Sequence, residues 1–144
     1  MIRTVLVDDE IDSIRVLQKL LESFCPQVAI VGMASGVETA LQVIRDTHPD
    51  LVFLDIEMAQ GNAFDLLNQL QPLLFHVIFV TAFDNYAVRA FKYSATDYLL
   101  KPVDIDDLRN AVARVQDRPM EKDLSEKMRT LLEHVGTLQI SQQK

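Results

Sequence analysis

The chain alternates between short, continuously apolar runs and longer segments in which apolar residues recur every three or four positions. Five short runs are rich in β-branched or aromatic side chains and predict strands at residues 4–7, 28–31, 51–54, 77–80 and 98–100. Helical spacing predicts helices over the remaining stretches, at residues 14–24, 37–44, 64–70, 86–93 and 105–115. Strand and helix therefore alternate five times along the chain.

This alternation predicts an α/β fold built on a doubly wound, five-stranded parallel sheet. Consecutive βα units require right-handed crossovers, and strands that are apolar throughout are buried on both faces, so helices should cover both sides of the sheet. In such sheets ligands bind at the carboxyl ends of the strands, near the point where the strand order switches. Functional side chains are therefore expected at this edge.

Polar residues stand directly after four of the predicted strands. The first strand ends in Asp8 and Asp9, the third in Asp55, the fourth in Thr81 and the fifth in Lys101. Taken singly, each could be a helix cap, a turn residue or solvated surface. Taken together, acids on two strands, a hydroxyl on another and an ammonium on a fourth indicate one site at this edge of the sheet.

The combination of side chains indicates phosphoryl transfer to a carboxylate. Three acids in a small volume repel by about 1 to 4 kcal/mol per pair at about 4 Å unless a cation neutralises them. Oxygen ligands of this kind suit Mg²⁺, which typically uses one or two carboxylates together with phosphoryl oxygens. A carboxylate nucleophile, a metal ion, and lysine and threonine donors form a complete electrostatic site for this reaction.

Composition narrows the remaining choices. A chain of 144 residues fits one domain, and its single cysteine, Cys25, excludes an intrachain disulfide and favours a reducing compartment. We find no signal peptide and no membrane-spanning apolar run, so we expect a cytoplasmic protein. The net charge of −7 lies within residues 1–118, with 10 basic and 17 acidic residues, which disfavours direct binding of nucleic acid.

Residues 1–118 resemble the receiver domain of two-component response regulators. Four stretches carry the resemblance: VLVDDE at 5–10, LVFLDIEM at 51–58, VIFVTA at 77–82 and TDYLLKPVD at 96–104. The resemblance implies the flavodoxin-like receiver fold and a sensor histidine kinase as partner. It also implies that phosphorylation switches the domain between two conformations that control an output.

The resemblance assigns a role to each matching residue. It implies that Asp55 is the phosphoacceptor, that Asp8 and Asp9 are the acidic metal pair, that Thr81 is the switch hydroxyl, and that Lys101 binds phosphoryl oxygens. Mg²⁺ would be held by Asp9, Asp55 and the backbone carbonyl of Glu57, with Asp8 acting through water. Tyr98 matches the aromatic side chain that reorients with the switch hydroxyl, and the bond preceding Pro102 is expected to be cis.

Three positions near Asp55 and Thr81 bear on the loop after Asp55 and on the loss of the phosphoryl group. Ala59 stands where the family pattern has proline, and we expect this departure to loosen the loop after Asp55. Glu57 and Phe83 match the positions that flank the path of the hydrolytic water. We hypothesise that the bulk of Phe83 slows the loss of the phosphoryl group.

The stretch 80–102 is further similar to receivers attached to LytTR-type DNA-binding domains, which implies a role in transcription regulation. The structural alternative is that the apolar residues of 86–93 only pack a helix. DNA would be contacted only through an output domain that is absent from these 144 residues, and the chain could be a fragment or a stand-alone receiver.

We expect residues 119–144 to form a separate C-terminal helical extension after Pro119. Its apolar residues have the 4-3-4-3 spacing of a coiled coil, at Leu124, Met128, Leu131, Val135 and Leu138. Two heptads are short for a coiled coil, and a simple linker helix explains the pattern equally well. A homodimer could form through this helix or through the face around Tyr98.

An enzyme of another class remains as the alternative function. Asp55 and Glu57 echo the DxD pattern of Mg²⁺-dependent aspartyl phosphohydrolases of the haloacid dehalogenase type. The nucleophile of such an enzyme is expected on the first strand, whereas Asp55 follows the third. A receiver should accept phosphate stoichiometrically, while a hydrolase should turn over many times.

Overall fold

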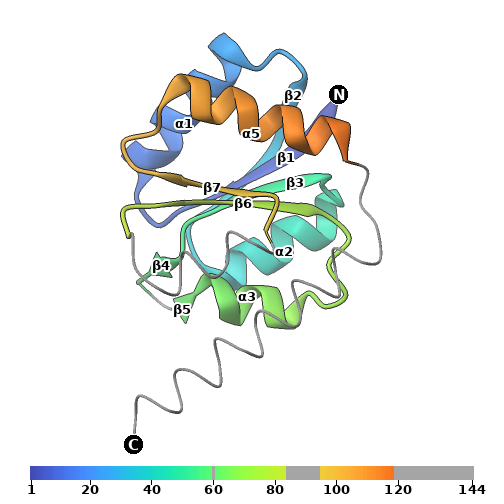
Figure 1. Ribbon diagram of the computed structural model, residues 1–144. Helices are drawn as coiled ribbons and strands as arrows, with labels where there is room; N and C mark the ends of the chain where they lie inside the picture. Colours follow the sequence, from blue (N-terminus) through green and yellow to red (C-terminus); the bar gives the residue numbers. More distant parts are fainter. Residues whose placement is uncertain (60, 84–94, 119–144) are drawn as a thin grey trace, which may run out of the picture.

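The computed structural model describes residues 1–59, 61–83 and 95–118, and its centre is a five-stranded sheet between two layers of helices (Figure 1). All neighbouring strands are parallel, and their order is β2-β1-β3-β6-β7. The strands are β1 (Ile2–Val7), β2 (Val28–Ala34), β3 (Leu51–Leu54), β6 (His76–Thr81) and β7 (Asp97–Leu100). The predicted doubly wound parallel sheet is confirmed.

Within the described residues, two helices cover each face of the sheet (Figure 1). One layer consists of α1 (Ile11–Phe24) and α5 (Ile105–Asp117), and the other of α2 (Val37–Thr47) and α3 (Ala63–Gln69). Four of the five predicted helices are thereby confirmed. The predicted helix over 86–93 and the predicted helical extension over 119–144 lie outside the described residues.

The apolar runs of the strands are continuous because successive side chains enter two different cores. In β1, Val5 and Val7 pack against α2 and α3, whereas Leu6 packs against α1 and α5. All four residues of β3 and all six of β6 are buried. A strand with helices on both faces needs apolar side chains at nearly every position, and polar residues are therefore tolerated mainly where it ends.

A small antiparallel hairpin follows β3, and the sequence pattern did not predict it. Its strands are β4 (Glu57–Met58) and β5 (Gly61–Asn62). Gly61 has φ of 129°, a region that strongly favours glycine. Asn62 then caps α3, because its Oδ1 accepts hydrogen bonds from the backbone N–H groups of Phe64 (2.9 Å) and Asp65 (3.1 Å). The chain after Asp55 is thus fixed by a hairpin and a cap.

Cys25 lies at the carboxyl end of α1, where it is buried and forms no disulfide. Burial raises the pKa of its thiol above the ordinary value, which the charge of Arg109 only partly offsets, so the reactive thiolate is disfavoured. Cys25 therefore serves packing. Among the helices of the described residues, none combines the length and the apolar character needed to cross a bilayer.

Candidate functional site

The strand order brings the polar strand ends together at one edge of the sheet. The central strand β3 lies between β1 and β6, and β7 pairs with the far side of β6. Backbone hydrogen bonds continue past the strand ends: Asp55 N–H donates to the Val7 carbonyl (3.1 Å), and Lys101 N–H donates to the Thr81 carbonyl (2.9 Å). These bonds fix the backbone from which the functional side chains project.

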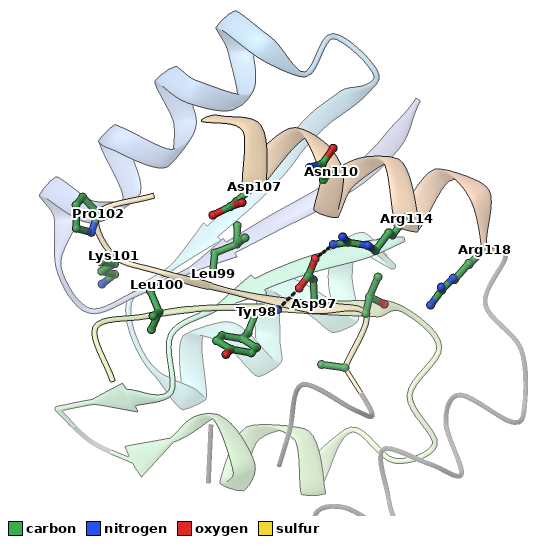
Figure 2. Close-up of a pocket in the computed structure, with 12 residues that line it drawn as sticks. Asp97, Tyr98, Leu99, Leu100, Lys101, Pro102, Asp107, Asn110, Arg114 and Arg118 are labelled. Carbon is green, nitrogen blue, oxygen red and sulfur yellow. Dashed lines mark hydrogen bonds and ion pairs between the residues drawn. The ribbon is translucent and has the colours of Figure 1, made fainter. Parts of the chain in front are cut away.

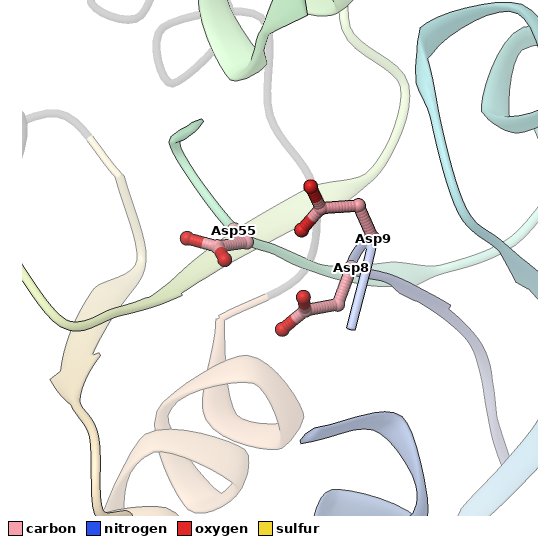
Figure 3. Close-up of side chains that lie close together, drawn as sticks. All are labelled: Asp8, Asp9 and Asp55. Carbon is pink, nitrogen blue, oxygen red and sulfur yellow. The ribbon is translucent and has the colours of Figure 1, made fainter. Parts of the chain in front are cut away.

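Three carboxylates converge at this edge. Asp8, Asp9 and Asp55 each offer one oxygen, and these oxygens lie within 4.8 Å of one another (Figure 3). Asp8 and Asp55 are buried, each with 6% of its surface exposed, whereas Asp9 is exposed. Like charges at this separation repel strongly, more so where water is excluded, so the cluster requires positive charge nearby.

Lys101 supplies part of that charge. Its Nζ donates hydrogen bonds to Asp8 Oδ2 (2.8 Å) and to Asp55 Oδ2 (3.2 Å). Burial alone would lower the pKa of Lys101, but the hydrogen bonds and charges of Asp8 and Asp55 outweigh it and raise that pKa above its ordinary value. The ammonium is therefore held charged between the two buried carboxylates.

The single ammonium of Lys101 does not neutralise three carboxylates, and the excess negative charge affects the pKa of Asp55. Burial raises the pKa of Asp55, the charge of Lys101 opposes this change, and the charge of Asp8 adds to it. The net result is a pKa above the ordinary value for an aspartate. The charged form of Asp55 is thus less favourable in the folded site than in water, and a further cation would offset this cost.

One oxygen of Asp55 indicates where that cation would bind. Asp55 Oδ1 is buried and has no partner at ordinary hydrogen-bonding geometry among the described residues, although the Thr81 hydroxyl lies close enough to lower the pKa of Asp55. Leaving such an oxygen unsatisfied is costly, whereas coordination to a cation would satisfy it. Because all three side chains offer oxygen, the donor set fits a hard divalent cation such as Mg²⁺. Glu57 begins β4 two residues beyond Asp55.

Thr81 and Phe83 lie at the end of β6. The Thr81 side chain is fully buried, and its Oγ1 accepts a hydrogen bond from the Phe83 backbone N–H (3.3 Å). Phe83 itself is partly exposed, at 38%. The threonine hydroxyl is therefore held beside the acidic edge, while the phenyl ring of the next-but-one residue is accessible to solvent.

A second feature runs along β7 and α5, where a pocket of about 740 Å³ is found (Figure 2). Tyr98 lines it and packs against the α2/α3 core, and Lys101 and Pro102 lie at one end of the pocket. Arg114 of α5 forms an ion pair with Asp97 across it. The peptide bond between Lys101 and Pro102 is cis.

The structure brings together the predicted acids and lysine, but sequence reasoning missed two of the contacts that hold them. The backbone N–H of Ala59 donates to Asp9 Oδ2 (2.9 Å), and that of Glu10 donates to Asp8 Oδ1 (2.9 Å). Every residue except proline carries a backbone N–H, so no pattern of side chains could have revealed these donors.

Comparison with known proteins decides the family. The family profile described as the response regulator receiver domain matches residues 4–113. The chain belongs to this family. The receiver is 40% identical over 126 residues to an uncharacterized response regulatory protein of Vibrio cholerae, with 87% of the receiver chain and 53% of that protein covered. It is 41% identical over 106 residues to the sensory transduction protein LytT of Bacillus cereus, with 72% and 43% covered.

Solved structures agree with this assignment. The response regulatory domain of protein mrkE from Klebsiella pneumoniae superposes with a TM-score of 0.69 at 26% identity, covering 80% of the receiver and 95% of that chain. A chain of the CheX–CheY–BeF3–Mg²⁺ complex from Borrelia burgdorferi gives a TM-score of 0.70 at 22% identity, covering 80% and 89%, and shows a shared fold.

These comparisons settle the class of protein. The chain is a receiver domain of a two-component response regulator, and its similarity to LytT supports the narrower resemblance to LytTR-type regulators. None of the relatives reported above is a hydrolase, so the alternative of a haloacid dehalogenase-type phosphohydrolase gains no support. The chain spans about half the length of the curated relatives that it matches.

Proposed function

We propose that Asp55 accepts a phosphoryl group from the phosphohistidine of a sensor histidine kinase. An Asp55 carboxylate oxygen attacks the phosphorus, the new O–P bond replaces the P–N bond, and the released imidazole takes up a proton. The product is an acyl phosphate on Asp55. The observation that carries this proposal is the buried Asp55, which lies among two acids and Lys101 and has one oxygen without a hydrogen bond.

The neighbouring side chains have distinct roles in this proposal. Asp9, Asp55 and the Glu57 backbone carbonyl would hold Mg²⁺, with Asp8 acting through water. When bound, the metal ion would neutralise charge on the transferring phosphoryl group. Lys101 is already directed at Asp55 and would donate to a phosphoryl oxygen. The cluster of three carboxylates and a single ammonium supports this division of labour.

The same chemistry would produce the conformational switch. A phosphoryl group on Asp55 presents new acceptor oxygens, and the hydroxyl of Thr81 would turn to donate to one of them. That turn would break its present hydrogen bond from Phe83 N–H. Tyr98, which borders the pocket along β7 and α5, would then follow Thr81 and change the surface of the domain.

We further propose that residues 1–118 are the receiver and that residues 119–144 connect it to an output. Similarity to LytT, of which this chain covers only part, supports a LytTR-type output that binds DNA and controls transcription. The chain would act in the cytoplasm and could dimerise through the face around Tyr98 or through the C-terminal segment.

The proposal is tested by intact mass after incubation with acetyl phosphate. Wild type should gain one phosphoryl mass only when Mg²⁺ is present, and hydroxylamine should remove it, as expected for an acyl phosphate. Asp55→Asn should gain nothing, whereas Asp46→Asn, which changes an exposed aspartate of α2, should behave like wild type.

Two outcomes would contradict the proposal. A phosphoryl mass on the Asp55→Asn variant would show that another residue is the acceptor. Steady release of phosphate over many turnovers, without accumulation of a covalent adduct, would indicate a hydrolase rather than a receiver.

A further inference from the structure

Asp9 differs from the other two acids of the cluster in what holds it. Lys101 Nζ pairs with Asp8 and Asp55, and no ion pair to Asp9 is found among the described residues. Asp9 is also the one exposed member of the three. An exposed carboxylate can reduce its repulsion from two neighbouring carboxylates by rotating toward water. A hydrogen bond or ion pair is therefore needed to keep Asp9 directed into the site.

The backbone N–H of Ala59 provides that restraint. It donates to Asp9 Oδ2 at 2.9 Å, across 50 residues of sequence. A carboxylate has two oxygens and about four acceptor positions, so one oxygen can stay bonded to the amide while the other serves a cation. The donor also directs the positive end of a backbone dipole at the most solvent-accessible charge of the cluster.

The donor is itself held in place by the loop that carries it. Ala59 follows β4, whose residues Glu57 and Met58 pair with Asn62 and Gly61 of β5. Asn62 in turn caps α3. The loop is thus anchored on both sides, by the sheet at Asp55 and by the helix beyond the hairpin, and its amide is fixed relative to the carboxylate cluster.

From these contacts we propose that the Ala59 backbone amide is a positioning group that holds the Asp9 carboxylate ready for the divalent cation. The inference rests on the proposed Mg²⁺ site and adds a residue to it. The placement of the Asp9 carboxylate depends on the backbone N–H at position 59, and every residue type except proline has such a group. The family pattern places proline here, so this chain has a donor that the pattern lacks.

The first test is Mg²⁺ binding to the full 144-residue chain, measured by isothermal titration calorimetry without a phosphodonor. Ala59→Pro removes the donor and should raise the Kd by about three- to tenfold, the size expected for one exposed hydrogen bond to a charged group. The matched control, Ala59→Ser, keeps the N–H and should bind within about twofold of wild type. Equal or tighter binding by Ala59→Pro would overturn the proposal.

A double-mutant cycle separates the effect of the hydrogen bond from strain caused by proline in the loop. The cycle compares Ala59→Pro in the wild-type and Asp9→Ala backgrounds, with Mn²⁺ as the probe and its electron paramagnetic resonance signal as the readout. Without the Asp9 carboxylate, Ala59→Pro should have little further effect on affinity. A loss of the same size in both backgrounds would mean that proline acts on the loop rather than on Asp9.

Phosphorylation kinetics provide an independent readout. With acetyl phosphate as donor, Ala59→Pro should need about three- to tenfold more Mg²⁺ for half of the maximal rate and reach the same plateau, because only the positioning of a metal ligand is changed. A lower plateau with unchanged Mg²⁺ dependence would contradict the assigned role. If Asp55 proved not to be phosphorylated at all, the two binding experiments would still decide this inference.

Discussion

Neutralising Asp55, the proposed phosphoacceptor, should make this receiver more stable. In Asp55→Asn, an amide of the same shape replaces a carboxylate that is 6% exposed and lies within 4.8 Å of two other acids. Each repulsion at that distance is worth roughly 0.9 to 3.5 kcal/mol, for effective dielectric constants between about 80 and 20. The attraction of Lys101 at 3.2 Å opposes them with roughly 1.3 to 5.2 kcal/mol.

The repulsions of Asp55 from the two other acids together exceed its attraction to Lys101, and the cost of burying the Asp55 charge further favours the neutral side chain. We therefore expect Asp55→Asn to raise the free energy of unfolding by about 0.5 to 2 kcal/mol, or the Tm by about 2 to 6 °C. The raised pKa of Asp55 has the same sign, because it means that the folded state disfavours the charged form.

The assay is urea unfolding at neutral pH with EDTA, repeated with saturating Mg²⁺. Asp46→Asn removes one exposed negative charge from the last turn of α2, which leads to the amino end of β3, whereas the cluster lies at the carboxyl ends of the strands; it should change stability by less than about 0.5 kcal/mol. Mg²⁺ should stabilise wild type and so narrow the gap to Asp55→Asn, because it binds only the folded site. A variant that is less stable than wild type in EDTA, or equal stabilisation of both proteins by Mg²⁺, would refute this reasoning.

Three further perturbations test other parts of the structure. Burial lowers the pKa of His76, which is 4% exposed and contacts the Thr96 hydroxyl (2.7 Å). Its contribution to stability is therefore present above the unfolded pKa near 6.5 and is lost as the pH falls through the lowered folded value. His76→Gln should flatten the profile of stability against pH between about 7.5 and 5, and an unchanged slope in urea unfolding would contradict this. Gly32→Ala should cost about 1 to 3 kcal/mol in urea unfolding, because its Cβ would lie 2.5 Å from Val43 Cγ1, and the double variant with Val43→Ala should not show the two losses adding. Phe83→Ala should shorten the lifetime of the acyl phosphate, measured by phosphate release after removal of donor, and an unchanged lifetime would remove the hypothesis that this ring shields the site.

The buried strands and the charged residues at their ends could be predicted from the sequence. Residues 51–54 are apolar throughout because β3 is covered on both faces, and this burial makes the adjoining Asp55 conspicuous. Parallel pairing then brings the ends of all five strands to one edge, so Asp8 and Lys101 could be placed in the same site although they are 93 residues apart.

Features that depend on backbone geometry could not be predicted in this way. The strands of the β4–β5 hairpin are two residues long, which is too short for any alternation of side chains to show. The hydrogen bond from Ala59 to Asp9 uses a donor common to almost all residues. The sequence could place Lys101 at the edge of the sheet, but it could not show that the ammonium pairs with Asp8 and Asp55, because that depends on the folded positions of the three side chains.

The ion pairs of Lys101 also have a consequence for the synthesis of the protein. Lys101 joins Asp8 across 93 residues and Asp55 across 46, and it reaches both only when β7 has paired with β6. A ribosome-bound chain that already contains Asp8, Asp9 and Asp55 would therefore still lack the ammonium that completes the site. On the proposed function, competence to be phosphorylated would therefore arise only after nearly the whole domain has emerged.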